Sequence, residues 1–421
     1  MSAIVAAPSP AQGPLASGKS LRRLAQVEIA LPHVSPWTTE AKAAGSDLAF
    51  QGDLLVAGAY EGFGLFRILD KAPYVEQLSF FDCPGTQGDV SIWGDYVFIS
   101  MEHQSAFYTR VTNEKVSPTC NAEGSAGQEG IRIVDISDPR APKQVKFVPI
   151  TCGSHNHTLI PDGDKMYIYN SALPLYQIDD YVQYCNRLSI VEFPIDDPTQ
   201  AAIASEPSMD LEIGCHDVTV FPKLDLAAGA CWMDSYLWDI SNPAEPKTVS
   251  KLPSDWVEGH HAAAFTWDGR YLAVGQESGD CTGKEGEIVF YDIRDPKKPK
   301  KVGRFHLPRA VTGSFCWSHN FATVPTKDKS RYVLTAGFYN GGVSVIDFSK
   351  PARAKEIGYA ALSQNGVLPE PWGAYWYNGR IYTNDWTSGL GVGVYKMKGL
   401  GAAAGKRFRG RFNPQLQTLG N

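Results

Sequence analysis

One apolar string recurs along the chain at a spacing that only a repeat architecture explains. Its clearest copy is GIRIVDISDP at residues 130–139. Related strings begin at Arg187, Ser235, Glu287 and Gly342, and degenerate copies cover residues 64–69 and 391–397. Their starts lie roughly 50 to 65 residues apart, which is the size of a four-stranded propeller blade rather than of a helical repeat.

Each repeat unit is predicted to hold four strands. A short inner strand comes first, a second strand follows a Gly-Asp or Asp-Gly turn such as 94–95 or 268–269, and the recurring string is the third. A turn containing proline separates the third strand from an outer strand, because proline cannot continue a central strand. Counting the units predicts an all-β, seven-bladed β-propeller.

The last unit lacks an outer strand, and the chain start offers one at residues 24–30. We therefore expect this N-terminal strand to complete blade seven and close the ring, which leaves no open edge there. The predicted organisation is a disordered arm at 1–20, a single propeller at 21–398 and a basic, solvated C-terminal tail at 399–421.

Composition narrows the function only slightly. The net charge of −6 argues against nucleic acid as the main partner, and no apolar run is long enough to span a membrane. The N-terminus does not resemble a secretory signal, so a cytoplasmic location is predicted, with a periplasmic or secreted one left open if the chain is trimmed. The eight cysteines include no CxxC pair and are expected to be buried fillers or to form one or two disulfides, with a thiolate ligand or nucleophile as the alternative.

The string at residues 131–139 and its relatives resemble the LVIVD-repeat proteins, whose repeats are taken to form β-propellers. The resemblance covers about residues 24 to 397 and implies a fold rather than an activity, since that family has no single activity. Asp47, Asp89 and Asp217 match the usual start of its inner strands. Histidines that lead several inner strands depart from the repeat, and such departures are where function is expected.

Four histidines occupy one position of the inner-strand repeat, although the chain has only nine histidines in all. They are His155, His216, His260 and His319, and the other three copies have Ser46, Gly88 and Trp372 there. Because the inner strands of a propeller all start on one face around the channel, these four imidazoles are predicted to converge on a metal ion. Fe(II) is the preferred ion, with Cu, Mn or Zn as alternatives.

The predicted tetrad is similar to the iron site of the carotenoid cleavage oxygenases, and less closely to the histidine-rich manganese site of oligogalacturonate lyases. Both are analogies of the site alone. Two other interpretations stay open: the histidines could be structural, or they could act in acid–base chemistry without a metal.

Further residues are assigned by their place near the tetrad. Neighbouring groups expected to orient the ligands are His157, Asp217, His261 and Asn320. Candidate catalytic groups in the loops after the second strands are Glu102, His103 and Glu277. An aromatic substrate pocket is predicted from Trp232, Trp317, Tyr339, Trp372 and Trp386.

These features predict a metal-dependent enzyme, most of all an O₂-using oxidoreductase that acts on an apolar or aromatic small molecule. A metal-dependent lyase is the second hypothesis, and a non-catalytic propeller that binds proteins through its loops is the third. No Walker loop, GxSxG elbow, HExxH motif or EF-hand loop is present, so cofactors held by those motifs are not expected. The oligomeric state is left open.

Overall fold

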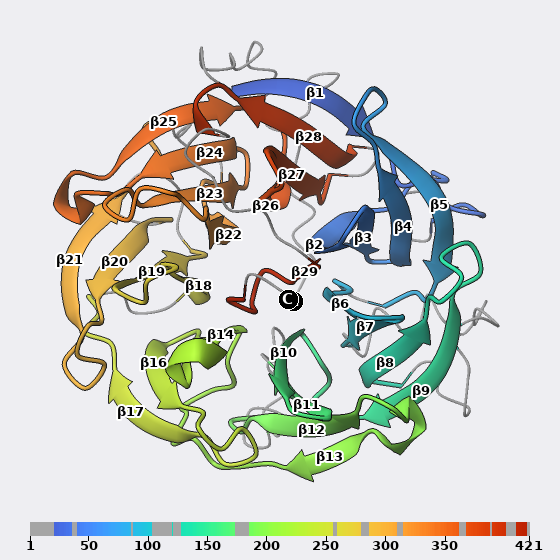
Figure 1. Ribbon diagram of the computed structural model, residues 1–421, viewed down its shortest axis with the longest axis horizontal. Coiled ribbons are helices and arrows are strands. Elements are labelled where there is room, and N and C mark those ends of the chain that lie inside the picture. The colour runs from blue at the N-terminus through green and yellow to red at the C-terminus, as the bar shows by residue number, and fades with distance from the viewer. Residues whose placement is uncertain are drawn as a thin grey trace, which may run out of the picture.

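The protein is a β-propeller whose sheets stand around a central channel (Figure 1). The computed structural model describes residues 21–35, 40–85, 87–102, 120, 128–172, 185–255, 259–278, 286–309, 315–361, 368–387, 390–400 and 410–418. Within these ranges the regular structure consists of strands and three short 3-10 segments, at Pro198–Gln200, Pro222–Leu224 and Pro351–Arg353. The prediction of an all-β propeller is confirmed.

Four of the sheets are simple antiparallel meanders of four strands. They are β6 (Val90–Trp93), β7 (Tyr96–Met101), β8 (Gly130–Asp135) and β9 (Lys143–Pro149); β10 (Asn156–Asp162), β11 (Lys165–Ser171), β12 (Ser189–Pro194) and β13 (Ala202–Ser205); β14 (Asp217–Phe221), β15 (Leu226–Cys231), β16 (Asp234–Asp239) and β17 (Lys247–Lys251); and β18 (His260–Phe265), β19 (Tyr271–Gln276), β20 (Ile288–Asp292) and β21 (Lys300–Phe305).

The two remaining sheets are larger. A five-stranded sheet contains β2 (Gly45–Gln51), β3 (Leu54–Ala59), β4 (Gly62–Ile68), β5 (Val75–Asp82) and β29 (Arg411–Phe412). An eight-stranded sheet contains β22 (Ser318–Thr323), β23 (Val333–Phe338), β24 (Gly342–Asp347), β25 (Lys355–Ala360), β26 (Pro371–Tyr377), β27 (Arg380–Asp385), β28 (Gly391–Met397) and β1 (Leu21–Val27).

The aspartate of the recurring string ends the third strand of a sheet by forming a turn. Its carboxylate accepts the backbone N–H two residues further on, at 2.7 Å for Asp135, 2.9 Å for Asp239 and 3.0 Å for Asp347. This side-chain mimic of a backbone turn directs the chain towards the outer strand. The repeat therefore recurs because each sheet needs the same turn.

The N-terminal strand closes the ring as predicted, but three residues earlier in the sequence. Strand β1 covers Leu21–Val27 rather than 24–30, and it pairs antiparallel with β28 from Leu21↔Met397 to Val27↔Val392. Strands β1 and β28, which are far apart in the sequence, thus share one sheet, which lies at the top of Figure 1. The proposed arm at 1–20 lies outside the described residues.

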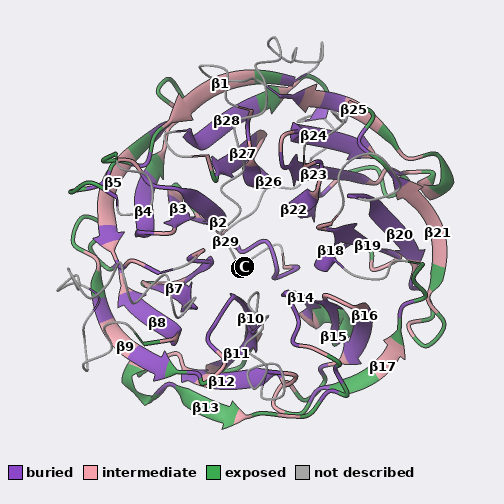
Figure 2. Ribbon diagram, turned by 180° about the vertical axis from the view of Figure 1, so that it is seen from behind, coloured by how far each residue is buried: buried purple, intermediate pink, exposed green. Residues whose placement is uncertain are grey.

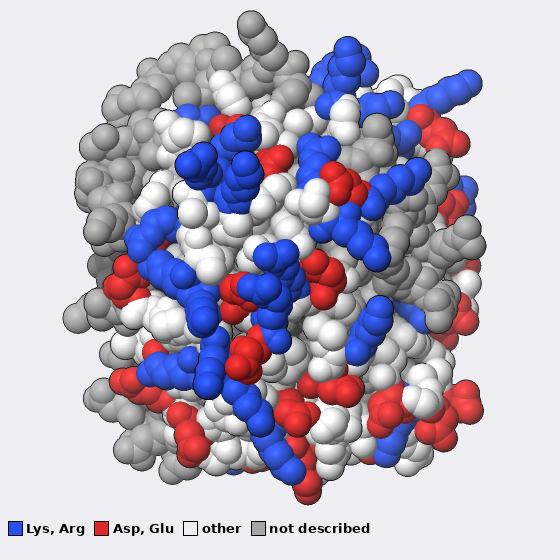
Figure 3. Space-filling model, turned by 60° about the vertical axis from the view of Figure 1, so that its left-hand side comes forward, with Lys and Arg blue, Asp and Glu red and all other residues white. Residues whose placement is uncertain are grey.

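Apolar side chains fill the spaces between neighbouring sheets, while the outer strands carry the exposed residues (Figure 2). Leu237 of β16, Leu272 of β19 and Val289 of β20, for example, belong to one buried cluster that joins two sheets. On the side of the ring that includes β21, lysines and arginines intermingle with acidic residues (Figure 3). Asp255 there pairs with Lys301 and Arg304, as is typical of exposed edges that avoid pairing with other sheets.

Residues 411–417 lie inside the channel, which corrects the prediction of a solvated tail for this segment. Phe412, Asn413, Gln415 and Leu416 are all buried. Asn413 pairs its amide with the backbone of Ile92 on β6, and Leu416 forms a parallel bridge with Val220 on β14. This segment therefore ties inner strands from different sheets together.

Candidate functional site

Two of the histidines that meet at the channel lie in β-bulges. In the β18–β19 pair the register passes from His260↔Gln276 to Ala263↔Val274, so His261 and Ala262 oppose a single residue. In the β22–β23 pair it passes from Ser318↔Phe338 to Phe321↔Ala336, so His319 and Asn320 do the same. A bulge of this kind redirects a side chain, and here it makes His261 the structural equivalent of His319.

The other two histidines lie one residue before unbulged inner strands. The backbone N–H of His155 donates to Ser171 of β11 at 2.9 Å, and that of His216 donates to Ala230 of β15 at 2.8 Å. Both backbones are thereby held by the second strand of their own sheet. The four imidazoles come from four consecutive inner strands of the ring.

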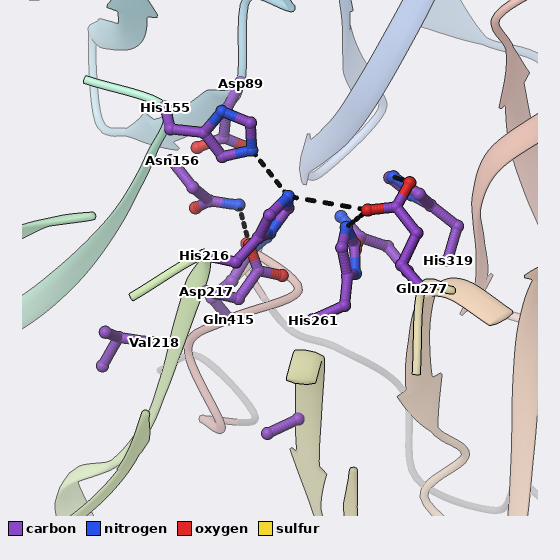
Figure 4. A network of polar contacts seen from close by, with 12 residues as sticks. Asp89, His155, Asn156, His216, Asp217, Val218, His261, Glu277, His319 and Gln415 are labelled. Atoms are coloured by element: carbon purple, nitrogen blue, oxygen red, sulfur yellow. Dashed lines mark hydrogen bonds and ion pairs between the residues drawn. The ribbon is translucent and has the colours of Figure 1, made fainter. Parts of the chain in front are cut away.

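These four rings form a continuous arc (Figure 4). The ring centroids are 4.1 Å apart for His155 and His216, 3.7 Å for His216 and His261, and 4.2 Å for His261 and His319. All four residues are at least 97% buried. Four imidazoles brought this close by separate strands form a preorganised cluster rather than four unrelated core residues.

Acceptors beside the rings fix which nitrogen points into the arc. Nδ1 of His155 lies 2.9 Å from a Glu102 carboxylate oxygen, and Nδ1 of His319 lies 2.6 Å from the Trp372 carbonyl. Nδ1 of His216 lies 3.1 Å from its neighbour Asp217. A carbonyl or carboxylate oxygen accepts, so each Nδ1 donates and each Nε2 keeps its lone pair. Anchoring of this kind is typical of histidines that bind metals.

The lone pairs converge closely enough to require a positive charge between them. Nε2 of His155 and Nε2 of His216 are 2.7 Å apart, and both rings already use Nδ1 as the donor. Two nitrogen acceptors at this distance repel each other unless a proton or a metal ion is shared between them. The arrangement therefore favours a bound cation.

Glu277 adds a carboxylate to the arc from the residue after β19. Its oxygens lie 3.2 Å from Nε2 of His261, 3.6 Å from Nε2 of His319 and 3.9 Å from Nε2 of His216. Ligand atoms of His216, His261 and Glu277 all lie within 4.8 Å of one another. Burial raises the pKa of Glu277 to about 8, although its side chain keeps 14% of its surface exposed.

Three imidazoles of the arc, those of His216, His261 and His319, are held in the neutral form. Burial lowers the pKa of His319 to about 3, and it lowers the pKa values of His216 and His261 well below the usual 6.5. The neighbouring imidazoles add to this effect, since a second positive charge nearby is unfavourable. Neutral imidazole is the form that binds a metal.

The structure corrects one member of the predicted tetrad. His260 does not join the arc, because its ring turns away to Oγ of Ser235 at 2.7 Å and Oγ of Ser254 at 3.2 Å. Its backbone pairs with Trp232 of the preceding sheet, which holds it at the start of β18. His261, which was expected only to orient a ligand, takes the position in the arc.

The other predicted orienting residues divide into two groups. Asp217 contacts His216 directly, as predicted, whereas His157 lies away from the arc with Nδ1 2.7 Å from Ser100 and 3.1 Å from Asp89. Asn320 donates to Asp47 at 3.1 Å. Of the candidate catalytic groups, Glu102 and Glu277 contact the arc, and His103 lies outside the described residues.

The predicted aromatic residues gather mainly at one end of the arc. Ring centroids of Tyr339 and Trp372 lie 4.6 and 4.5 Å from that of His319, and Trp386 lies 5.7 Å from Tyr339. Trp386 is 39% exposed, so this group reaches solvent. Trp317 is at the edge of the group, 6.3 Å from Tyr339, whereas Trp232 lies on the histidine side, 6.4 Å from His216.

Tyr60 completes this aromatic group and was not singled out as a pocket residue. Its ring stacks with Trp386 at 6.4 Å and meets Trp372 edge-on at 6.2 Å. Tyr60 follows β3 as Tyr339 follows β23 and Trp386 follows β27. Tyr60 could therefore have been found from the sequence, as the aromatic residue that directly follows a second strand.

Three disulfides join described cysteines: Cys83–Cys120, Cys152–Cys185 and Cys215–Cys231. This exceeds the one or two that were expected. Disulfides persist in oxidising compartments and are rare in the cytosol, so they argue against the predicted cytoplasmic location. No helix among the described residues is long and apolar enough to cross a membrane.

Comparison with known proteins finds one segment of the chain that matches a family model. The LVIVD repeat matches residues 126–148, which include β8 and most of β9. No curated protein matches the chain significantly. The resemblance inferred from the recurring string is thus confirmed.

Solved structures similar to this one are also propellers. The periplasmic gluconolactonase PpgL of Pseudomonas aeruginosa has a TM-score of 0.53 and 12% sequence identity, over 76% of this chain and 86% of that one. A putative 6-phosphogluconolactonase of Bacteroides uniformis has a TM-score of 0.52 and 12% identity, over 81% and 89%. At this identity the likeness concerns the fold.

The prediction of an O₂-using oxidoreductase, with a lyase as second choice, is wrong. It rested on an analogy between four histidines and the iron site of the carotenoid cleavage oxygenases. The similar solved structures are named as lactonases, which are hydrolases. In addition, the arc differs from the imagined tetrad in its third histidine and in the carboxylate of Glu277.

Proposed function

We propose that this protein is a metal-dependent hydrolase whose substrate is a small cyclic ester, a lactone. The observation that carries the proposal is the arc itself: His155, His216, His261 and His319 with Glu277, three of them anchored through Nδ1. Nitrogen and carboxylate donors together suit a divalent first-row transition metal such as Zn, Mn or Fe. The lactonase names of the structural neighbours support the choice of hydrolysis.

A metal held by the arc would polarise the ester carbonyl and lower the pKa of a bound water. Glu277 would act as the general base and then as the general acid. Its carboxylate would accept a proton from the attacking water while the water oxygen bonds to the carbonyl carbon. It would return that proton to the ring oxygen when the C–O bond of the lactone breaks, and the product is a hydroxy acid.

The protein contributes position and desolvation as well. Glu102, Asp217 and the Trp372 carbonyl hold the imidazoles in place, so little reorganisation is needed when charge develops. The aromatic group at the end of the arc offers flat apolar surfaces that fit the ring of a small substrate and exclude water beside it.

We also infer that the ring has seven blades. The eight-stranded sheet counts as two blades, since its halves are joined by the parallel pairing of β22 with β26 at Asn320↔Gly373 and Phe321↔Ala374. Strand β1 then completes the blade of β26, β27 and β28. Consistent with the disulfides, we propose that the protein works in an oxidising compartment such as the periplasm or the cell exterior.

The test combines metal analysis with hydrolysis. Protein purified without chelators is expected to hold about one transition-metal ion per chain. It should open sugar and aliphatic lactones faster than buffer does, as followed by acid release at constant pH. Chelation should abolish this activity, and the same ion should restore it. Fully loaded protein that opens no lactone in such a panel would overturn the proposal.

A further inference from the structure

A second ring of polar side chains lies in the channel, one residue further along the inner strands than the histidines. It contains Asp47 on β2, Asp89 just before β6, Asn156 on β10, Asp217 on β14 and Asn320 on β22. Gln415 of the C-terminal segment adds a sixth group. All six residues are at least 95% buried.

Hydrogen bonds join five of these groups in two sets, and Asp89 is bonded outside both. Asn156 donates to Asp217 at 2.6 Å, while Asn320 and Gln415 donate to the same oxygen of Asp47 at 3.1 and 3.0 Å. Asp89 accepts the backbone N–H of His157 at 3.0 Å. Figure 4 shows Asn156 and Asp217 beside His216, and Asp89 next to His155.

The amide donors in this cluster are used up and the Tyr375 hydroxyl lies against Asp47, but several acceptors have no partner. A carboxylate only accepts, so the amide nitrogens of Asn156, Asn320 and Gln415 must face the aspartates. Their amide oxygens then point elsewhere, and all three have no hydrogen-bond partner. One oxygen of Asp89 is unpartnered as well. Four buried oxygens without donors are costly unless a ligand satisfies them.

Among the described residues, the acidic side chains of the cluster pair only with histidines, Asp89 with His157 and Asp217 with His216. Asp47, Asp89 and Asp217 form no ion pair with any lysine or arginine in the described part of the chain. Buried carboxylates are normally paired or bind a metal. Protons on Asp47 and Asp217 would relieve part of this charge, since burial and neighbouring aspartates raise the pKa of Asp47 to about 7 and that of Asp217 well above its usual range.

We propose that this ring binds a hard cation, of which Ca²⁺ is the best fit, at a site separate from the histidine arc. Carboxylate and amide oxygens are the donors that Ca²⁺ prefers, whereas the arc offers mainly nitrogen. The only compact trio of ligand atoms among described His, Cys and acidic residues is that of His216, His261 and Glu277. The ligand atoms of the second ring lie further apart than those of this trio, so its ion would keep water molecules among its ligands, as Ca²⁺ does.

The C-terminal segment is part of this site. Asn413 fixes it to β6 and the Leu416–Val220 bridge fixes it to β14, so Gln415 is held between the sheets that supply Asp89 and Asp217. The backbone of Gln415 also accepts from Val220 at 2.8 Å. The cation thus links blades across the channel and couples their stability to the end of the chain.

The experiment measures Ca²⁺ binding to the full chain by calorimetry after chelation, together with the melting temperature. We expect about one Ca²⁺ per chain and a higher melting temperature when it binds. Asp89→Asn should abolish both responses, and Gln415→Met should weaken binding at least about tenfold. Gln417→Met is the matched control, because Gln417 contacts Thr323 rather than an aspartate.

A His261→Ala variant separates this site from the proposed function, because it should lose the transition metal and keep the Ca²⁺ response. Two results would overturn the proposal. One is a Ca²⁺ response that Asp89→Asn and Gln415→Met leave unchanged, which places the ion elsewhere. The other is a protein without any Ca²⁺ response in which Asp89→Asn raises the melting temperature, since removal of a repelling charge then stabilises the fold.

Discussion

The two sides of the channel mouth use the same repeat positions for different chemistry. On one side, inner strands present His155, His216, His261 and His319, and Glu277 follows the second strand β19. On the other side, the corresponding inner-strand positions hold Trp372, Ser46 and Gly88, and Tyr60 and Trp386 follow the second strands β3 and β27. The two sides meet at two boundaries: Glu102 follows β7 of the Gly88 sheet and contacts His155, and Tyr339 follows β23 of the His319 sheet and contacts Trp386.

The backbone geometry of these positions is set by the repeat, so their side chains can vary without loss of the fold. The histidine side concentrates groups that could hold a metal ion, and the aromatic side concentrates flat rings, of which Trp386 is exposed to solvent. Where the two sides meet, the His319 ring contacts Tyr339 and Trp372. A substrate held on the aromatic side would thus place its reacting bond next to the arc.

The strongest test of this division replaces neighbours on one strand. His261→Ala removes a ring from the arc, so we expect loss of most bound transition metal and at least about a 1,000-fold fall in hydrolytic activity, since a Lewis acid contributes several kcal/mol. Elemental analysis and lactone hydrolysis measure the two effects. His260→Gln is the control and should keep both within about threefold. Equal losses in the two variants would show that the arc is not the metal site.

The sequence located the histidine side but misassigned one residue in it. Alignment without gaps equated His260 with His319, and the ring architecture made their convergence a sound inference. Both strands carry the same bulge, and the two bulges coincide only when His261, rather than its neighbour His260, is aligned with His319. Gly275 and Gly337 lie opposite the two bulges, where a side chain would collide with the next sheet. These two glycines are a feature of the sequence from which the positions of the bulges, and hence the correct alignment, could have been predicted.

The position of the chain end could not be predicted in the same way. Residues 411–417 carry no repeat pattern, and their basic residues suggested a solvated tail. Their burial depends on backbone and amide groups, such as those of Asn413 and Gln415, that find partners on inner strands distant in sequence. Such long-range polar contacts leave no periodic trace, whereas the Asp–Pro turns and the closing strand do.

His260 allows a second test, because its burial should affect stability rather than catalysis. Burial lowers its pKa from 6.5 to about 4, so the folded state binds fewer protons than the unfolded state between these values. The contribution of neutral His260 to the free energy of unfolding is fully present above pH 6.5 and is lost as the pH falls towards 4. By linkage, this loss amounts to about 2 to 3 kcal/mol between pH 7 and pH 4.5.

Urea unfolding at both pH values would measure this effect in a His261→Ala background, which removes metal binding from the comparison. Adding His260→Gln should make the loss of stability on acidification smaller by that amount. If the double variant loses as much stability as the single one, His260 does not remain neutral in the folded protein.

The smallest expected effect concerns the aromatic side. Trp386→Ala removes the most exposed ring of the group, which stacks with Tyr60 and faces solvent. An aromatic contact of this kind contributes about 1 kcal/mol. We therefore expect KM for lactones to rise about five- to tenfold, with kcat within about threefold and metal content unchanged. Trp386→Phe keeps a flat ring and should recover most of the affinity. A large fall in kcat with unchanged KM would place Trp386 in the reaction itself and erase the division between the two sides, because the aromatic group would then act on the transition state rather than on binding.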